Sequence, residues 1–256
     1  MTRRVIFALL LAGLALPGLA NADAVVDLRG SLSRLQASQP LAASLKVSTT
    51  AKNEQGKTTH AQLQVSVASS GNGLTMGFSP DLLQRASREA AINAKNKDAP
   101  TPIGDLLGQL SAVSVQSAAD HAPVLLREIN GAALTSQRDE VHDGKPTHLL
   151  VFDVPLPPSA SKRMTIKHYT GQIMVWLDSN GVPSAERTVT EVKGRKFLVS
   201  IEFGNTSNYR LGTVGSRLVV LSRHSEESHS VFGQSGSSVT DAVLMPEATT
   251  AARAGT

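Results

Sequence analysis

The sequence contains no cysteine, and aromatic residues make up only 4% of it. The lack of cysteine excludes structural disulfides, thiol nucleophiles and zinc sites built on cysteine ligands. It also removes the acylated cysteine that anchors bacterial lipoproteins, so we expect the mature protein to be free in its compartment. Because aromatics are scarce, the core of this 256-residue chain has to be built mainly from aliphatic side chains.

Long apolar runs are also missing, apart from one short stretch at the N-terminus. Arg3 and Arg4 precede an apolar segment from Val5 to Leu19, which is too short to span a bilayer. Small residues then alternate in the pattern that signal peptidase requires. The sequence therefore predicts a cleavable secretion signal over residues 1–22, cut after Ala22 or Ala24. The short positive segment and the leucine-rich core favour the general export route over the twin-arginine route.

Neither sign of charge dominates the mature chain. Removing residues 1–22 takes away Arg3 and Arg4 and no acidic residue, so the formal net charge falls from +4 to +2. No basic run interleaved with aromatics suggests a nucleic-acid partner. With no later segment apolar enough to form a transmembrane anchor, we expect a periplasmic protein.

Helical signals occur at the mature start and in the middle of the chain. Over Asp27–Ser38, leucines recur at the spacing of one helix face. A capping serine, a proline and an acid at 79–81 predict a helix that runs to about Asn96. Further helices are predicted over Ile103–Ala119 and Val124–Ile129.

The rest of the chain alternates apolar and polar residues, as half-buried strands do. Asp143-Gly144 and Asn180-Gly181 are typical of tight hairpin turns. A strand over 196–203 is predicted from the clean alternation of Phe197, Val199, Ile201 and Phe203.

Short strands joined by tight turns form an antiparallel sheet, and the mid-chain helices can cover the face that it must bury. The sequence thus predicts a mainly β fold with a helical insert (α+β), in which a curved antiparallel sheet or unclosed β half-barrel is capped by helices. We expect one β-rich domain over residues 23–245, with the insert at about 79–130 and a tail at 246–256 that frays.

This order resembles the LolA-like group of periplasmic lipoprotein carriers and outer-membrane lipoprotein-sorting proteins. The matching features are an exported start, a first helix with Leu28, Leu32 and Leu35, a strand from Leu41, mid-chain helices before His142-Asp143-Gly144-Lys145, and Val175-Trp176-Leu177-Asp178 leading into Asn180-Gly181-Val182-Pro183. The resemblance implies an unclosed half-barrel whose apolar cavity holds acyl chains. It also implies a lipid or lipoprotein client.

Apolar strand faces provide the candidates for such a cavity. The candidate lining residues are Leu74, Met76, Phe78, Ile173, Val175, Phe197, Val199 and Ile201. The alternative is that they pack solidly under the helices as ordinary core.

Catalytic and metal signals are weak. His224, Glu226, Glu227 and His229 include metal-binding types, but this spacing is equally that of a polar hairpin loop. Neither a nucleophile elbow nor a phosphate or dinucleotide loop is present, and Ser159-Ala160-Ser161-Lys162 lacks the partner motifs of a Ser-x-x-Lys enzyme.

Three functions remain open from the sequence. The first is a non-enzymatic periplasmic binding protein, without cofactor, that holds an apolar ligand or lipid tail between a curved sheet and helices. The second is an envelope protein-interaction module with a filled core. The third is a hydrolase or metal-dependent enzyme whose site is assembled from scattered residues.

Overall fold

The computed structural model describes residues 17–35, 37, 39–70, 73–158 and 164–247. Its helices are α1 (Pro17–Arg34), α2 (Pro80–Lys95), α3 (Pro102–Gln109), α4 (Ala112–Ala119) and α5 (Ala122–Asn130). Its strands are β1 (Leu41–Lys52), β2 (Thr58–Ser70), β3 (Gly73–Phe78), β4 (Ala133–His142), β5 (Lys145–Asp153), β6 (Thr165–Leu177), β7 (Pro183–Lys196), β8 (Val199–Val214), β9 (Arg217–Val231) and β10 (Gln234–Pro246).

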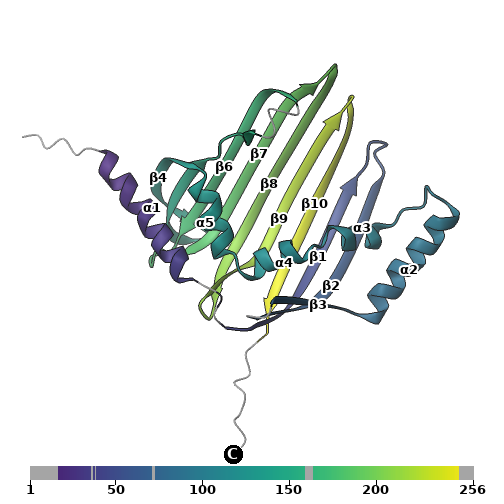
Figure 1. The fold of residues 1–256 in the computed structure, drawn as a ribbon, viewed down its shortest axis with the longest axis horizontal. Coiled ribbons are helices and arrows are strands. Elements are labelled where there is room, and N and C mark those ends of the chain that lie inside the picture. Colours follow the sequence, from purple (N-terminus) through teal and green to yellow (C-terminus); the bar gives the residue numbers. More distant parts are fainter. Residues whose placement is uncertain (1–16, 36, 38, 71–72, 159–163, 248–256) are drawn as a thin grey trace, which may run out of the picture.

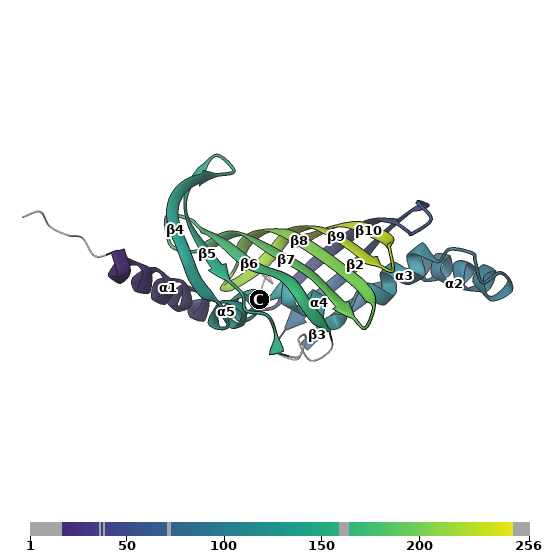
Figure 2. The ribbon, with the colours of Figure 1, turned by 90° about the horizontal axis from the view of Figure 1, so that it is seen from above.

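All ten strands form one antiparallel sheet in the order β3-β2-β1-β10-β9-β8-β7-β6-β5-β4. The first and last strands of the chain meet in its middle, where Val47 of β1 is opposite Ala242 of β10. β3 and β4 are the two edges and do not pair with each other, so the sheet is not closed. It curves over the helices: α3, α4 and α5 cross its inner face, and α1 and α2 lie toward its two sides (Figures 1 and 2). The predicted fold class is confirmed.

The helical insert joins the two edges of the sheet. Because it leaves from β3 and returns at β4, it has to cross the full width of the inner face, about 43 Å for ten strands. α3 packs on β2, α4 on β9, and α5 between α1 and β9. The insert is therefore a row of helices across the sheet (Figure 1).

The core on the inner face is divided into two clusters. One is built on β1 and β2 and is covered by α2, α3 and α4, with Leu63 and Val65 at its centre. The other is built on β5, β6 and β9 and is covered by α1 and α5, with Leu28 and Phe152 fully buried. The space between the clusters lies over β9 and β10.

Local sequence patterns predicted many of these elements. Leu28 and Leu32 are buried, as their spacing on one helix face indicated. Ser79 caps α2, and its hydroxyl oxygen accepts a hydrogen bond from the backbone N–H of Leu82 at 3.2 Å. The hairpin turns at Asp143-Gly144 and Asn180-Gly181 are confirmed.

Three expected elements differ from the structure. α1 begins and ends earlier than Asp27–Ser38. The single helix predicted over Ile103–Ala119 is broken into α3 and α4, because Ser111 caps a new helix through the N–H of Ser114. Phe197 lies in a hairpin turn rather than in a strand, because Lys196 pairs with Val199 and leaves only two residues to turn the chain.

Among the described residues, no helix has both the length and the apolar character needed to cross a membrane. Residues 1–16, 36, 38, 71–72, 159–163 and 248–256 lie outside the described residues, and with them the expected turn at Gly71-Asn72 and all of Ser159–Lys162. The predictions of a secretion signal and of a fraying tail fall largely on these segments.

Candidate functional site

A cavity of about 770 Å³ lies between the helices and the sheet, in the gap between the two core clusters. Its roof comes from α3, α4 and α5, and its floor from β1, β2 and β7–β10. Drug-sized ligands and cofactors occupy cavities of about 300–1,000 Å³, so this one is large enough for a molecule rather than for a few waters.

One end of the cavity is apolar. The side chains that line it there come from β1, β2, β10, α3 and α4, and they are Leu45, Val47, Leu63, Leu106, Leu110, Val115, Ala242 and Leu244. They contain no hydrogen-bonding atoms, so this end can only contribute apolar contacts. Small and polar residues follow along β10, where Thr240 and Ser238 continue the floor.

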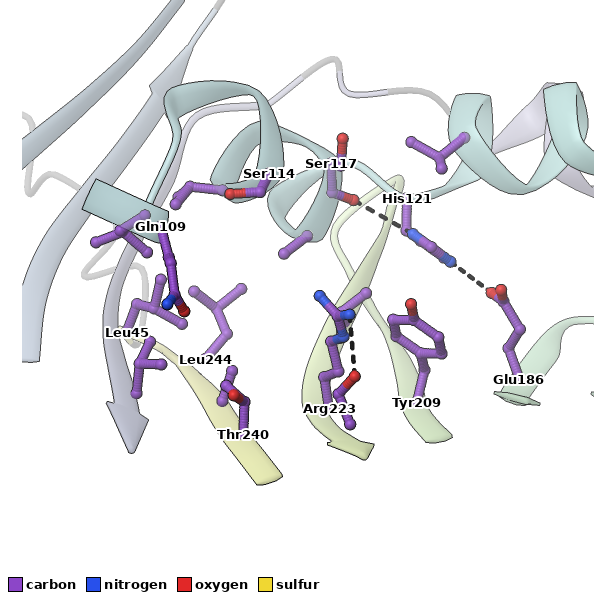
Figure 3. Close-up of a pocket in the computed structure, with 18 of the residues that line it drawn as sticks. Leu45, Gln109, Ser114, Ser117, His121, Glu186, Tyr209, Arg223, Thr240 and Leu244 are labelled. Carbon is purple, nitrogen blue, oxygen red and sulfur yellow. Dashed lines mark hydrogen bonds and ion pairs between the residues drawn. The ribbon is translucent and has the colours of Figure 1, made fainter. Parts of the chain in front are cut away.

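The other end of the cavity is polar, and a buried ion pair lies there (Figure 3). The Nε2 atom of His121 lies 2.6 Å from a carboxylate oxygen of Glu186, and both side chains are almost fully buried. The Nδ1 atom of His121 lies 3.3 Å from the carbonyl oxygen of Ser117. Both partners can accept, so the arrangement suits a His121 ring that donates from both nitrogens, which is the charged form.

Electrostatics support this assignment. Burial lowers the pKa of His121, but the hydrogen bond to Glu186 and the negative charges of Glu186 and Glu128 outweigh burial and raise the pKa above its ordinary value. Burial and the neighbouring Glu186 raise the pKa of Glu128. One oxygen of Glu128 is buried without a hydrogen-bond partner in the described part of the chain.

Tyr209 and Arg223 extend the polar end along β8 and β9. The Tyr209 ring stacks on His121 with centroids 5.7 Å apart, and the Arg223 guanidinium lies 5.5 Å from the centre of the Tyr209 ring. One terminal nitrogen of Arg223, Nη2, donates to the hydroxyls of Ser207 and Ser225, both at 3.2 Å. These bonds hold a cation at the cavity wall.

Backbone and side-chain contacts fix the helices above the cavity. The backbone N–H of His121 donates to the carbonyl oxygen of Leu218 in β9 at 2.8 Å, which anchors the start of α5. The buried Arg217 donates to the carbonyl oxygen of Ala119 at 3.3 Å and to that of Gln39 at 2.6 Å. The end of α4 and the segment before β1 are therefore tied to one guanidinium.

The eight residues predicted to line a cavity do not lie at the wall of this one. Leu74 and Met76 pack against the first cluster, whereas Ile173 and Val175 are buried in the second. Phe78 is partly exposed at the edge strand β3. Their alternation indicated a buried face but not which part of that face is hollow.

The remaining three predicted lining residues lie at the β7–β8 hairpin. Val199 and Ile201 are half-buried near the start of β8. Phe197 is exposed in the turn itself.

The four candidate metal ligands lie in the strand β9 rather than in a hairpin loop. Strand alternation puts His224 and Glu226 on one face and Glu227 and His229 on the other. His224 is bonded to Asp241 at 2.7 Å and to Glu226 at 3.2 Å. Among the described residues, no group of three or more potential ligands converges on a metal site.

Comparisons with known proteins give a match in structure but not in sequence. Neither a protein-family model nor a curated protein matches the sequence. The structure is similar to the crystal structure of a LolA superfamily protein from Nitrosomonas europaea, with a TM-score of 0.31 and 14% sequence identity, over 87% of this chain and 93% of that one.

Proposed function

We propose that this protein is a non-enzymatic binding protein of the bacterial periplasm that holds an amphiphile with an acyl tail between its curved sheet and its helices. The observation that carries the proposal is the cavity of about 770 Å³, whose wall changes from aliphatic at β1 and β2 to hydrogen-bonding at β7–β9. An amphiphile has the same division. The predicted secretion signal supports the proposed location.

Burial of the tail supplies the affinity. Each methylene group that moves from water into the apolar end contributes about 0.8 kcal/mol, which is about a fourfold gain in affinity. The row of leucines and valines from Leu45 to Leu244 offers no competing polar contact. Affinity is therefore expected to rise with chain length until this end is full.

The polar end selects the head group. Arg223 lines this end, and its two serine partners use only Nη2 of a guanidinium that has several donors. Glu128 lines the same end and offers a carboxylate to a hydroxyl or ammonium group. A polar head group that both accepts and donates hydrogen bonds fits these residues better than a hydrocarbon end.

The alternative function, a protein-interaction module of the cell envelope, was expected to have a filled core. The cavity argues against it. Among the described residues, no serine hydroxyl is hydrogen-bonded to His121, the pairing that would favour a hydrolase.

Native mass spectrometry of the purified protein, followed by displacement of a fluorescent fatty acid, tests the proposal. Ala118 lines the cavity, so Ala118→Trp is expected to fill it and to abolish binding. Ala90 is exposed on α2, away from the cavity, so Ala90→Trp is the matched control and should bind normally. The proposal fails if the wild-type protein neither carries nor binds any acyl compound, or if Ala118→Trp binds as tightly as wild type.

A further inference from the structure

Two neighbouring hairpins of the sheet end in exposed apolar side chains. Phe197 and Leu198 form the turn between β7 and β8 and are 92% and 97% exposed, and Phe232, in the turn between β9 and β10, is 76% exposed. Ile201 of β8 pairs with Val231 of β9, which places the two turns side by side. Figure 1 shows both tips at the same end of the sheet.

Folding does not account for phenylalanine at these two positions. Phe197 has φ 55° and Phe232 has φ 56°, the left-handed region that turns normally fill with glycine, asparagine or aspartate. The chain uses such residues in its other hairpins, for example Asp143-Gly144. At both tips a bulky aromatic residue therefore has a strained backbone and a side chain exposed to water. This combination indicates a residue that contacts another molecule.

Cations flank the tip between β7 and β8. Arg195 and Lys196 are exposed immediately before Phe197, and Lys167 is exposed on the neighbouring strand β6. The described part of the chain forms no ion pair with any of these three. Glu202 is already paired with Lys193 at 3.5 Å, so its negative charge does not offset the charge of these three cations.

We infer that these two hairpin tips, which we call the Phe tips (Phe197, Leu198 and Phe232), dock the protein onto an anionic lipid bilayer. Protruding apolar side chains enter the boundary between head groups and acyl chains, and flanking lysine and arginine side chains meet the anionic head groups. The two tips carry three apolar side chains at separate points. A fluid lipid surface can adapt to each of these side chains. A protein partner would need a matching set of pockets.

The strands that carry the Phe tips also border a second hollow of about 660 Å³, lined by Lys193, Phe203 and His229 among others. Docking through the Phe tips would hold this hollow near the membrane. Any role in exchanging the bound amphiphile rests on the proposed function, whereas docking itself does not.

Vesicle flotation with the full protein tests the inference, using phosphatidylcholine vesicles with and without phosphatidylglycerol. The double variant Phe197→Asn/Phe232→Asn replaces both aromatics by a residue that accepts positive φ, so it should fold at least as well as wild type. Wild type is expected to float with the anionic vesicles, less at high salt. Each substitution is expected to weaken binding about tenfold, and both together about a hundredfold.

Two control variants separate docking from general effects. Val113→Asn and Val141→Asn change apolar side chains that are 77% and 71% exposed elsewhere, and they should bind vesicles as wild type does. Arg195→Gln/Lys196→Gln should lose the preference for anionic vesicles.

The possible results distinguish this inference from the proposed function. The inference is overturned if wild type ignores anionic vesicles at low salt, or if the double asparagine variant binds them unchanged. Capture of a protein partner through the Phe tips without vesicle binding would also overturn it. Vesicle binding by a protein that holds no fatty acid would leave docking intact and remove the proposed function.

Discussion

Replacing His121 by alanine is the sharpest test of the buried polar end of the cavity. Glu186 is 2% exposed, and His121 is its hydrogen-bond partner in the described structure. The substitution leaves a carboxylate in the interior without a counter-charge. Removing one partner of a buried ion pair costs about 3–5 kcal/mol, a large part of the stability of a typical domain.

The chain supplies a matched control at its surface. His148 contacts Asp139 at 2.7 Å, nearly the His121–Glu186 distance, but the Asp139 side chain is 92% exposed. Exposed ion pairs contribute at most about 1 kcal/mol, because water and salt screen them. His148→Ala should therefore cost several kcal/mol less than His121→Ala. Both pairs join a histidine to a carboxylate at nearly the same distance, so the difference in cost reports mainly on burial.

Urea unfolding followed by circular dichroism and by the fluorescence of Trp176, the single tryptophan, measures both effects. The double variant His121→Leu/Glu186→Leu should recover most of the loss, since it leaves no unpaired charge behind. If His121→Ala and His148→Ala cost the same within about 1 kcal/mol, or if the double variant is no better than His121→Ala, the electrostatic reasoning is wrong.

Three further predictions follow from single contacts. Because the pKa of His121 is raised in the folded protein, its protonation stabilises the fold fully below the ordinary pKa of 6.5, and this stabilisation is lost as pH rises through the pKa of the folded state. The free energy of unfolding should therefore fall above pH 6.5, and it should fall less in His121→Ala. Ser79→Ala should cost about 1 kcal/mol and speed amide hydrogen exchange in the first turn of α2. Arg217→Leu should cost at least about 2 kcal/mol in thermal or urea unfolding, because the buried carbonyl oxygen of Ala119 and the buried hydroxyl of Ser69 lose this donor, and unchanged stability would contradict this.

Local chemistry accounts for what could be predicted from the sequence. The capping hydroxyl of Ser79 and the turn residues Asp143-Gly144 and Asn180-Gly181 act within a few residues, so their patterns are visible in any short window. The leucine spacing in α1 is equally local. These signals suffice for the order of elements and, with the rule that neighbouring strands pair, for an antiparallel sheet covered by helices.

The site depends on contacts between residues that are far apart in the sequence. Thr49 of β1 meets Thr240 of β10 across 191 residues, and this pairing puts Leu45 and Leu244 into one wall. His121 and Glu186 are 65 residues apart. His121 lies between the helices predicted over Ile103–Ala119 and Val124–Ile129, but nothing near it in the sequence indicated a buried partner.

The position of the cavity follows from the size of the side chains that face each other across it. α3, α4 and α5 have eight or nine residues each, about 12–14 Å, and together they must cross most of a sheet about 43 Å wide. Where α4 passes over β9 and β10, small residues face small residues: Ser114 and Ala118 above, and Ser225 and Thr240 below. Aromatic side chains at these positions would fill the gap, as Phe152 does in the second cluster. The scarcity of aromatics in this chain is therefore a cause of its cavity, and adding one such side chain at Ala118 should be enough to close it.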